Sequence, residues 1–187
     1  IRIKKFKIVV DGINSSGGVF VPFLLEKLGV EVIKLNCVPD GNFSHNPEPL
    51  SNNLTELSDL VVSTGADLGI AVDPDVDRLV FICEDGSFFG EEYTIVAIAK
   101  YVLSNRIGNT VCNLSSSNAL KDITLSFGGN HFYSPVGEAN VIQVMKENNA
   151  IFGGEGSGGV IFPELHYGRD ALVGIALFLS LISRSNL

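Results

Sequence analysis

The stretch Asp73-Pro74-Asp75-Val76-Asp77-Arg78 joins two apolar runs, 68–72 and 79–83, and places three carboxylates at alternate positions. In an extended chain or a tight turn, residues two apart point the same way, so these three side chains can converge on one point. Three ionised carboxylates repel one another unless a cation lies between them. Mg²⁺ suits such a set because it takes oxygen ligands at about 2.0 to 2.1 Å and keeps positions open for a phosphate or water. The stretch therefore predicts a metal-binding loop between two β-strands, with Asp73, Asp75 and Asp77 as ligands.

Three alternative interpretations of this stretch require different residues or flanking elements. A solvated turn needs one or two aspartates rather than three in register, although Asp and Pro are common turn formers. An EF-hand calcium loop has similar spacing, with Glu84 at its twelfth position, but it needs Gly where this chain has Arg78, and it needs flanking helices. In an aspartyl-phosphate phosphatase, Asp73 is the nucleophile and Asp75 the acid. That mechanism leaves Asp77 and Arg78 without a role.

Strand-like and helix-like segments alternate along the chain, which indicates a layered α/β architecture. In the first predicted helix, Val19, Phe23 and Leu24 share a face with Leu28. Ser51 is placed to cap the second helix. We predict an α/β fold of two consecutive three-layer domains with mixed sheets, residues 1–86 and 87–187, divided at the Asp85-Gly86 turn. The predicted strands are 8–10, 30–35, 68–72, 79–83, 110–114, 131–134 and 150–153, and the later helices are 91–103, one ending near Gly128, 139–147 and one after Asp170.

Composition narrows the class of protein. The 187 residues are 45% hydrophobic with a net charge of -8, and the basic residues are scattered outside the N-terminal segment, so we expect no nucleic-acid surface. The apolar run 171–182 is too short to span a bilayer and predicts a buried helix. The three cysteines, Cys37, Cys83 and Cys112, have no CxxC spacing and predict reduced core thiols, hence a cytoplasmic protein. The first residue is Ile1, and we expect the chain to be part of a longer one.

A second loop is rich in glycine. Gly153-Gly154-Glu155-Gly156-Ser157-Gly158-Gly159 follows the predicted strand 150–153 and precedes the apolar run 160–162. Glycines allow a backbone to approach a ligand closely, and the two side chains, those of Glu155 and Ser157, suit neighbouring sugar hydroxyls. The alternative is a flexible hairpin tip whose polar side chains face water.

Together the two loops resemble the α-D-phosphohexomutase superfamily, whose members interconvert sugar 6-phosphates and sugar 1-phosphates. The aspartate run is similar to the metal loop of that family, and Gly154 to Gly158 are similar to its Gly-Glu-x-Ser-Gly sugar loop. Further similar motifs follow in the family's order: Val9-Val10-Asp11-Gly12, Pro39-Asp40-Gly41-Asn42-Phe43, Gly90-Glu91-Glu92, Val136-Gly137-Glu138 and Arg169-Asp170.

The resemblance covers nearly the whole chain and implies domains two and three of the usual four. It implies a mutase that works through a phosphoserine and a sugar bisphosphate, with Mg²⁺ held by the three aspartates and Arg78 directing the phosphate. Gly154, Glu155, Ser157 and Arg169 would bind the sugar phosphate. The phosphoserine and the phosphate-gripping site would lie in the absent first and fourth domains, so we expect this chain alone to be inactive. Phosphoglucosamine mutase is favoured over phosphoglucomutase or phosphomannomutase, and a non-catalytic module that binds sugar phosphate or metal is the alternative.

The chain departs from the family pattern in two places and carries one misleading match to it. Gly159 stands where the sugar loop often ends in His, and His166 is a possible substitute. Pro135 stands where a basic residue is common before the Val-Gly step. The segment Ser44-His45-Asn46-Pro47 copies four letters of the family's phosphoserine loop, but it lies in the second domain and lacks the preceding small residues. We therefore interpret it as a loop of that domain and not as the phosphorylated site.

Overall fold

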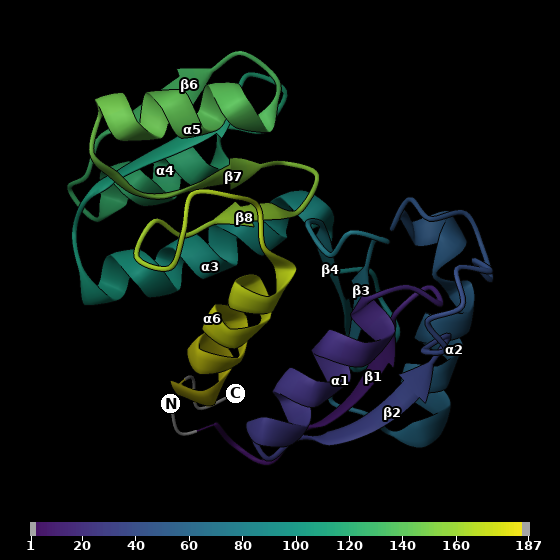
Figure 1. Cartoon of the computed structure of the whole chain (residues 1–187). Coiled ribbons are helices and arrows are strands. Elements are labelled where there is room, and N and C mark those ends of the chain that lie inside the picture. The colour runs from purple at the N-terminus through teal and green to yellow at the C-terminus, as the bar shows by residue number, and fades with distance from the viewer. Residues whose placement is uncertain (1–2, 185–187) are drawn as a thin grey trace. The chain divides into compact units, whose positions relative to one another are not determined.

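The computed structural model describes residues 3–184 and divides the chain into two compact units, Ile1–Gly90 (unit 1) and Glu91–Leu187 (unit 2). Each unit contains one four-stranded sheet (Figure 1). The α/β prediction with two mixed sheets is confirmed.

Unit 1 has the strand order β2-β1-β3-β4. The first three strands are mutually parallel, and β4 returns antiparallel to β3. The segment between β3 and β4 is the aspartate loop. The elements are β1 (Lys7–Asp11), α1 (Gly17–Lys27), β2 (Glu31–Leu35), a 3-10 turn (Ser51–Asn53), α2 (Thr55–Thr64), β3 (Leu68–Val72) and β4 (Leu79–Cys83).

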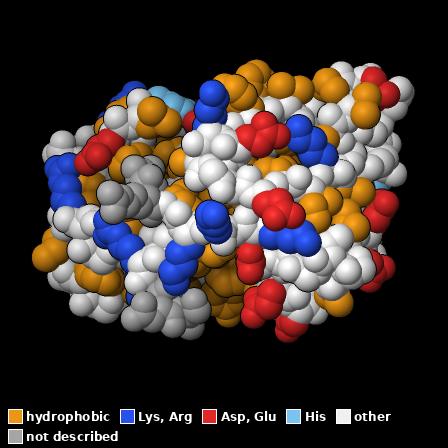
Figure 2. Space-filling model, turned by 90° about the horizontal axis from the view of Figure 1, so that it is seen from below, with side chains coloured by type: hydrophobic (Ala, Val, Ile, Leu, Met, Phe, Trp, Pro, Cys, Tyr) orange, Lys and Arg blue, Asp and Glu red, His pale blue; other side chains and the backbone are white. Residues whose placement is uncertain are grey.

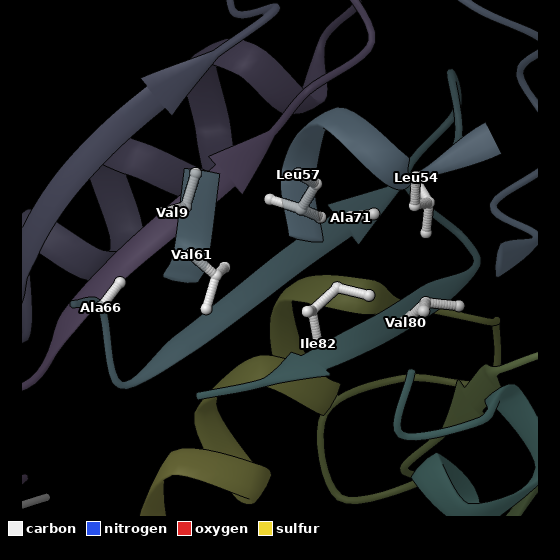
Figure 3. Close-up of a cluster of buried hydrophobic side chains, with 8 residues drawn as sticks. All are labelled: Val9, Leu54, Leu57, Val61, Ala66, Ala71, Val80 and Ile82. Carbon is white, nitrogen blue, oxygen red and sulfur yellow. The ribbon is translucent and has the colours of Figure 1, made fainter. Parts of the chain in front are cut away.

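Helix α2 covers one face of this sheet. Its side chains Leu57 and Val61 pack on alternate strand residues, among them Val9 and Ala71 (Figure 3). A Cβ at Gly69 would lie 2.9 Å from a methyl of Val61, so glycine there permits the helix to lie close to β3. All eight residues of the cluster are at most 2% exposed: Val9, Leu54, Leu57, Val61, Ala66, Ala71, Val80 and Ile82.

Helix α1 packs on the opposite face, and its orientation differs from the prediction. The buried residues include Gly17, Val21 and Leu25, which recur every four positions, whereas Val19 and Phe23 are 47% and 58% exposed. A Cβ at Gly17 would lie 2.4 Å from a methyl of Val72. The helix therefore approaches the sheet through its glycines, and the face predicted from the larger apolar residues was wrong.

Unit 2 repeats the arrangement with the strand order β6-β5-β7-β8. Again three strands are parallel, and the last returns antiparallel. Helix α5 covers one face, with Val141 and Met145 packed on Val111 and Ile161. The elements are α3 (Glu91–Asn105), β5 (Asn109–Asn113), α4 (Ala119–Ser126), β6 (His131–Ser134), α5 (Glu138–Glu147), β7 (Ala150–Glu155), β8 (Gly159–Ile161) and α6 (Ala171–Arg184).

One helix boundary differs from the predictions. Ser51 begins a 3-10 turn and makes no capping hydrogen bond, and α2 starts at Thr55 after the buried Leu54. Residues 87–89 lie with unit 1 because they pair back onto β4: the Phe89 N–H donates to Phe81 O, and Phe88 bridges to Ile82.

Lys and Arg side chains on the face shown in Figure 2 are scattered among acidic and apolar side chains. Among the helices of residues 3–184, none combines the length and apolar character needed to cross a membrane.

Candidate functional site

The aspartate loop lies at the edge of the unit 1 sheet where the parallel strands end. Val72 and Leu79 form the last pair of the β3–β4 hairpin, so residues 73–78 lie beyond this edge. Asp73, Asp75 and Asp77 each place a carboxylate oxygen within 4.8 Å of the other two. The convergence expected from their alternate spacing is therefore present. Because β-strands flank the loop, the EF-hand alternative does not fit.

The turn depends on an unusual backbone at Val76. Its φ is +62°, in the left-handed region that β-branched residues rarely adopt. The Val76 N–H donates to the Asp73 carbonyl at 3.1 Å, which closes the turn. Strained conformations of this kind cluster at ligand-binding sites, and here the strain lies between two of the three converging carboxylates.

Asp73 organises the loop as well as contributing to the cluster. It is 4% exposed, and its Oδ1 accepts the N–H groups of Asp77 and Arg78, both at 3.0 Å. Burial, together with the charges of Asp77 and Asp75 and only partly offset by the Arg78 N–H, raises the pKa of Asp73 to about 7. A divalent cation would remove this cost, and the oxygen-only donor set fits a hard ion such as Mg²⁺. A buried, hydrogen-bonded carboxylate is poorly placed as a phosphatase nucleophile.

Arg78 lies between carboxylates from two different segments. Its Nη1 donates to Glu48 Oε2, and its Nε is 3.4 Å from Asp73 Oδ2. Burial acts to lower the pKa of the Arg78 guanidinium, but the hydrogen bond and charge of Glu48 and the charge of Asp73 outweigh it, so that the pKa is raised. Arg78 thus remains cationic beside the aspartate cluster.

The end of β1 contributes a second buried carboxylate to the same edge. Asp11 is 2% exposed; its Oδ1 accepts the Ile13 N–H at 2.9 Å, and its Oδ2 is 2.9 Å from His45 Nε2. His45 belongs to the segment 44–47 that copies the phosphoserine loop. In this structure His45 fastens the segment to β1, a contact that fits our interpretation of the segment as a loop of this domain.

The glycine-rich loop occupies the corresponding edge of the unit 2 sheet. Glu155 is the last residue of β7 and is 6% exposed. Its Oε1 accepts from Asn113 Nδ2 at 2.7 Å and from the Gly137 N–H at 3.2 Å, and its Oε2 accepts from Arg169 Nη1 at 2.7 Å. Ser157, at the tip, is exposed. The structure therefore joins Glu155 to Arg169 inside the unit and presents Ser157 at the surface.

Close contacts explain two of the glycines in this region, one of them a contact with Arg169. A Cβ at Gly159 would lie 2.5 Å from Arg169 Cδ, so the arginine passes over the position where the family often has His. A Cβ at Gly154 would lie 2.2 Å from the Gly159 carbonyl oxygen, so Gly154 permits the close pairing of β7 with β8. The Arg169 N–H also donates to Glu138 Oε1 at 2.7 Å.

His166, the possible substitute for the missing histidine, is tied to a helix end. Its Nε2 is 2.9 Å from Asp170 Oδ2. The other oxygen of Asp170 accepts the N–H groups of Leu172 and Val173, at 2.7 and 3.1 Å, and so caps α6. A structural role in holding the start of α6 accounts for these contacts.

Sequence reasoning gave no role to three residues that organise these loops: Glu48, Asn113 and Glu138. Asn113 carried a usable signal, because a polar residue directly after an apolar strand lies at the carboxyl edge of a parallel sheet, where ligands bind. No sequence signal pointed to Glu48, because it lies 30 residues from Arg78 along the chain.

Family comparisons agree with this geometry. Residues 1–86 match the family described as phosphoglucomutase/phosphomannomutase, alpha/beta/alpha domain II, and residues 90–187 match domain III of the same family. The chain belongs to the phosphohexomutase superfamily. It represents domains II and III of that superfamily, as the two loops indicated.

Two curated relatives illustrate the range of similar enzymes. A phosphoglucomutase/phosphomannomutase of Thermococcus kodakarensis is 39% identical over 95% of this chain and 40% of its own length. A probable phosphoglucosamine mutase of Methanosarcina barkeri is 38% identical over 97% of this chain and 42% of its own length. This phosphohexomutase chain thus spans about two fifths of the length of these relatives.

A solved structure supports the fold over the whole chain. The phosphoglucomutase/phosphomannomutase family protein of Burkholderia thailandensis has a TM-score of 0.92 and 30% identity, covering 100% of this chain and 42% of that one. A putative phosphomannomutase of Thermus thermophilus, at 24% identity and a TM-score of 0.88, shows the same fold.

Proposed function

We propose that this chain is the metal-binding and sugar-binding part of a Mg²⁺-dependent phosphohexomutase that interconverts hexose 6-phosphate and hexose 1-phosphate. The observation that carries the proposal is the convergence of Asp73, Asp75 and Asp77 within 4.8 Å, in a segment that matches domain II of the family. The parent enzyme would work through a phosphoserine and a sugar bisphosphate. The phosphoserine and the fourth domain would lie in parts of the parent outside this chain, so the chain alone would not turn over substrate.

In this mechanism the three aspartates hold the cation. Bound Mg²⁺ would neutralise charge on the transferring phosphoryl group, a reaction that depends mainly on positioning and electrostatics. Arg78 adds a planar, permanently charged donor beside the cluster and orients a phosphate oxygen. The buried Asp73 keeps the loop in shape through the hydrogen bonds it accepts from Asp77 and Arg78.

In the sugar-binding loop, the exposed Ser157 offers a hydroxyl group to the ring hydroxyls of the substrate. Glu155, fixed by Arg169 and Asn113, retains a lone pair on Oε2, which accepts a second hydroxyl. Gly154 lets the two strands of the hairpin lie close together, and Arg169 balances the charge of Glu155. Holding two hydroxyls would let the sugar bind in either orientation while its ends exchange.

The favoured substrate is a glucosamine phosphate, with glucose and mannose phosphates as the alternatives. Relatives of both kinds, named probable phosphoglucosamine mutase or phosphoglucomutase/phosphomannomutase, are 33–39% identical to this chain. One or two contacts at the C2 substituent can decide this preference. A cytoplasmic location belongs to the same proposal, and the free thiols of Cys37, Cys83 and Cys112 support it.

A coupled isomerase assay on the full-length parent tests the proposal. Glucosamine, glucose and mannose phosphates are offered with Mg²⁺ and trace bisphosphate, and Asp75→Ala is compared with Asp59→Ala, an exposed aspartate of α2. We expect isomerisation to be lost in the first variant and kept in the second. If a phosphorylated, intact parent isomerises none of these sugars, the mutase proposal fails and a non-catalytic binding module takes its place.

A further inference from the structure

Glu48 lies in the long segment between β2 and α2 and contacts the candidate phosphate-binding arginine. Its Oε2 accepts from Arg78 Nη1, while Arg78 Nε faces Asp73 Oδ2 at 3.4 Å. A guanidinium has five N–H groups in a planar fork. With Nη1 bonded to Glu48 and Nε buried beside Asp73, Nη2 is left for an oxyanion.

The backbone of Glu48 is held although its side chain is 50% exposed. Its N–H donates to Asn46 Oδ1 at 3.0 Å, and its carbonyl accepts from Leu50 N–H and Asn53 Nδ2, both at 2.8 Å. Pro47 and Pro49 flank it, so that φ of each proline is fixed and the conformation of Glu48 is restricted by the proline that follows. The carboxylate is therefore presented from a constrained segment.

A second contact fastens the same segment to the sheet. His45, three residues before Glu48, contacts the buried Asp11 carboxylate at the end of β1. The segment is thus tied to β1 through His45 and to the aspartate loop through Glu48. Surface ion pairs between two flexible side chains contribute little, but one partner here comes from a segment fixed by backbone hydrogen bonds and a buried contact.

We propose that Glu48 is a positioning residue that holds Arg78 in the orientation needed to bind a phosphate oxygen beside the aspartate cluster. Without Glu48, the nearest anions for the Arg78 guanidinium are the aspartates themselves. The arginine would then turn toward Asp73 and Asp77, where it competes with the cation and no longer faces the phosphate. The functional part of this inference rests on the proposed phosphohexomutase activity, whereas the structural part does not.

The structural part is tested on this chain by NMR hydrogen exchange of the Arg78 Nη–H groups in the presence of Mg²⁺, because Glu48 accepts from Nη1. We expect Glu48→Ala to accelerate this exchange about 10-fold and Glu48→Gln, which keeps an acceptor oxygen, to have a smaller effect. Glu26→Ala is the matched control, because Glu26 pairs with Lys34 at 3.1 Å on the surface of the same unit. Unchanged Arg78 exchange in Glu48→Ala overturns the proposal.

The functional part is tested by kinetics of the full-length parent. We expect Glu48→Ala to lower kcat about 10-fold with KM changed less than threefold, and to cause no further loss when Arg78 is already alanine. Wild-type kcat in Glu48→Ala, or a loss that multiplies with that of Arg78→Ala, overturns the positioning role. A parent inactive on every sugar rejects the proposed function instead, and the exchange measurement still decides whether Glu48 holds Arg78.

Discussion

The two units share one strand order but carry different chemistry at the same place. In each unit an antiparallel hairpin ends at the carboxyl edge of three parallel strands. The hairpin of unit 1 closes with the apolar pair Val72 and Leu79, followed by a strained acidic loop. The hairpin of unit 2 closes with Glu155 and Gly159, followed by a short glycine-rich tip. One backbone plan would thus support the proposed cation site in one case and the proposed hydroxyl-recognition site in the other, because function lies in the loops at the sheet edge.

The first strand of each sheet ends in a polar residue that supports the neighbouring loops. Asp11, the last residue of β1, contacts His45 and so holds the segment that carries Glu48. Asn113, the last residue of β5, donates to Glu155 and accepts from Ser116. A charged residue holds the segment beside the aspartate loop, and a neutral amide holds the carboxylate of the glycine-rich loop. A neutral residue is sufficient beside Glu155 because Arg169 already balances the charge of that carboxylate.

The largest expected effects test whether the two cores are equivalent. Leu57 on α2 and Met145 on α5 occupy corresponding helices and are both fully buried. We expect each change to alanine to reduce the free energy of unfolding of its own unit by about 2–5 kcal/mol, through lost burial and the cavity left behind. Hydrogen exchange of β1 and β5 amides measures the two units separately. A loss below about 1 kcal/mol at one position would show that its core is less tightly packed.

Metal binding should distinguish the two hairpins. We expect Asp77→Ala to weaken binding of Mg²⁺ or Mn²⁺ about 100-fold, equivalent to about 2.8 kcal/mol, because one of three converging ligands is removed. Ser157→Ala, in the other hairpin, should leave the affinity unchanged. Isothermal titration calorimetry of this chain is the measurement. Equal affinities for Asp77→Ala and the unsubstituted chain would remove the assignment of Asp77 as a ligand.

The Arg169 side chain over Gly159 is a feature of unit 2 alone, since the large Leu79 fills the matching position in unit 1. We expect Gly159→Ala to destabilise unit 2 by about 1–3 kcal/mol, because the new methyl group displaces Arg169 from Glu155. The cost should shrink in an Arg169→Ala background, as judged by denaturant unfolding of the single and double variants. If the effects of Gly159→Ala and Arg169→Ala on the free energy of unfolding are additive, displacement of Arg169 is not the cause of the destabilisation.

The smallest effect concerns acid stability and the histidine of β6. Burial, with the nearby charge of Lys121, lowers the pKa of His131 to about 4. The unfolded chain has the higher pKa, near 6.5, so it binds the proton first and stability falls as the pH drops from about 6.5 toward 4. This difference in pKa corresponds to at most about 3.4 kcal/mol. Because His131 is only partly buried, solvent screening reduces the effect, and we expect a loss of about 1–2 kcal/mol, measured by unfolding at several pH values.

His131→Gln is the control for this titration. It cannot gain the proton, so the pH dependence of unfolding over that range should become shallower in this variant. An identical slope in both proteins would assign the acid sensitivity to other groups.

The sequence alone determined the α/β class, the two hairpin loops and the residues that converge in the first. Alternation in a strand has a period of two whatever the surroundings, so Asp73, Asp75 and Asp77 could be assigned to one side from spacing. The α-helices of residues 91–105 and 171–184 were similarly visible as long apolar runs. The buried face of α1 was not visible in the sequence, because the close approach of the helix to the sheet at Gly17 outweighed the burial of Phe23.

Only the tertiary structure decided which polar groups meet across the chain. The three pairs are Glu48 with Arg78, His45 with Asp11, and Asn113 with Glu155.

 The separations along the chain are 30 residues for the first pair, 34 for the second and 42 for the third. Local propensity and periodicity act over a few residues and carry no information about such pairs. They form because parallel strands bring their carboxyl ends to one edge of a sheet, where each buried carboxylate must find a hydrogen-bond donor or a positive charge.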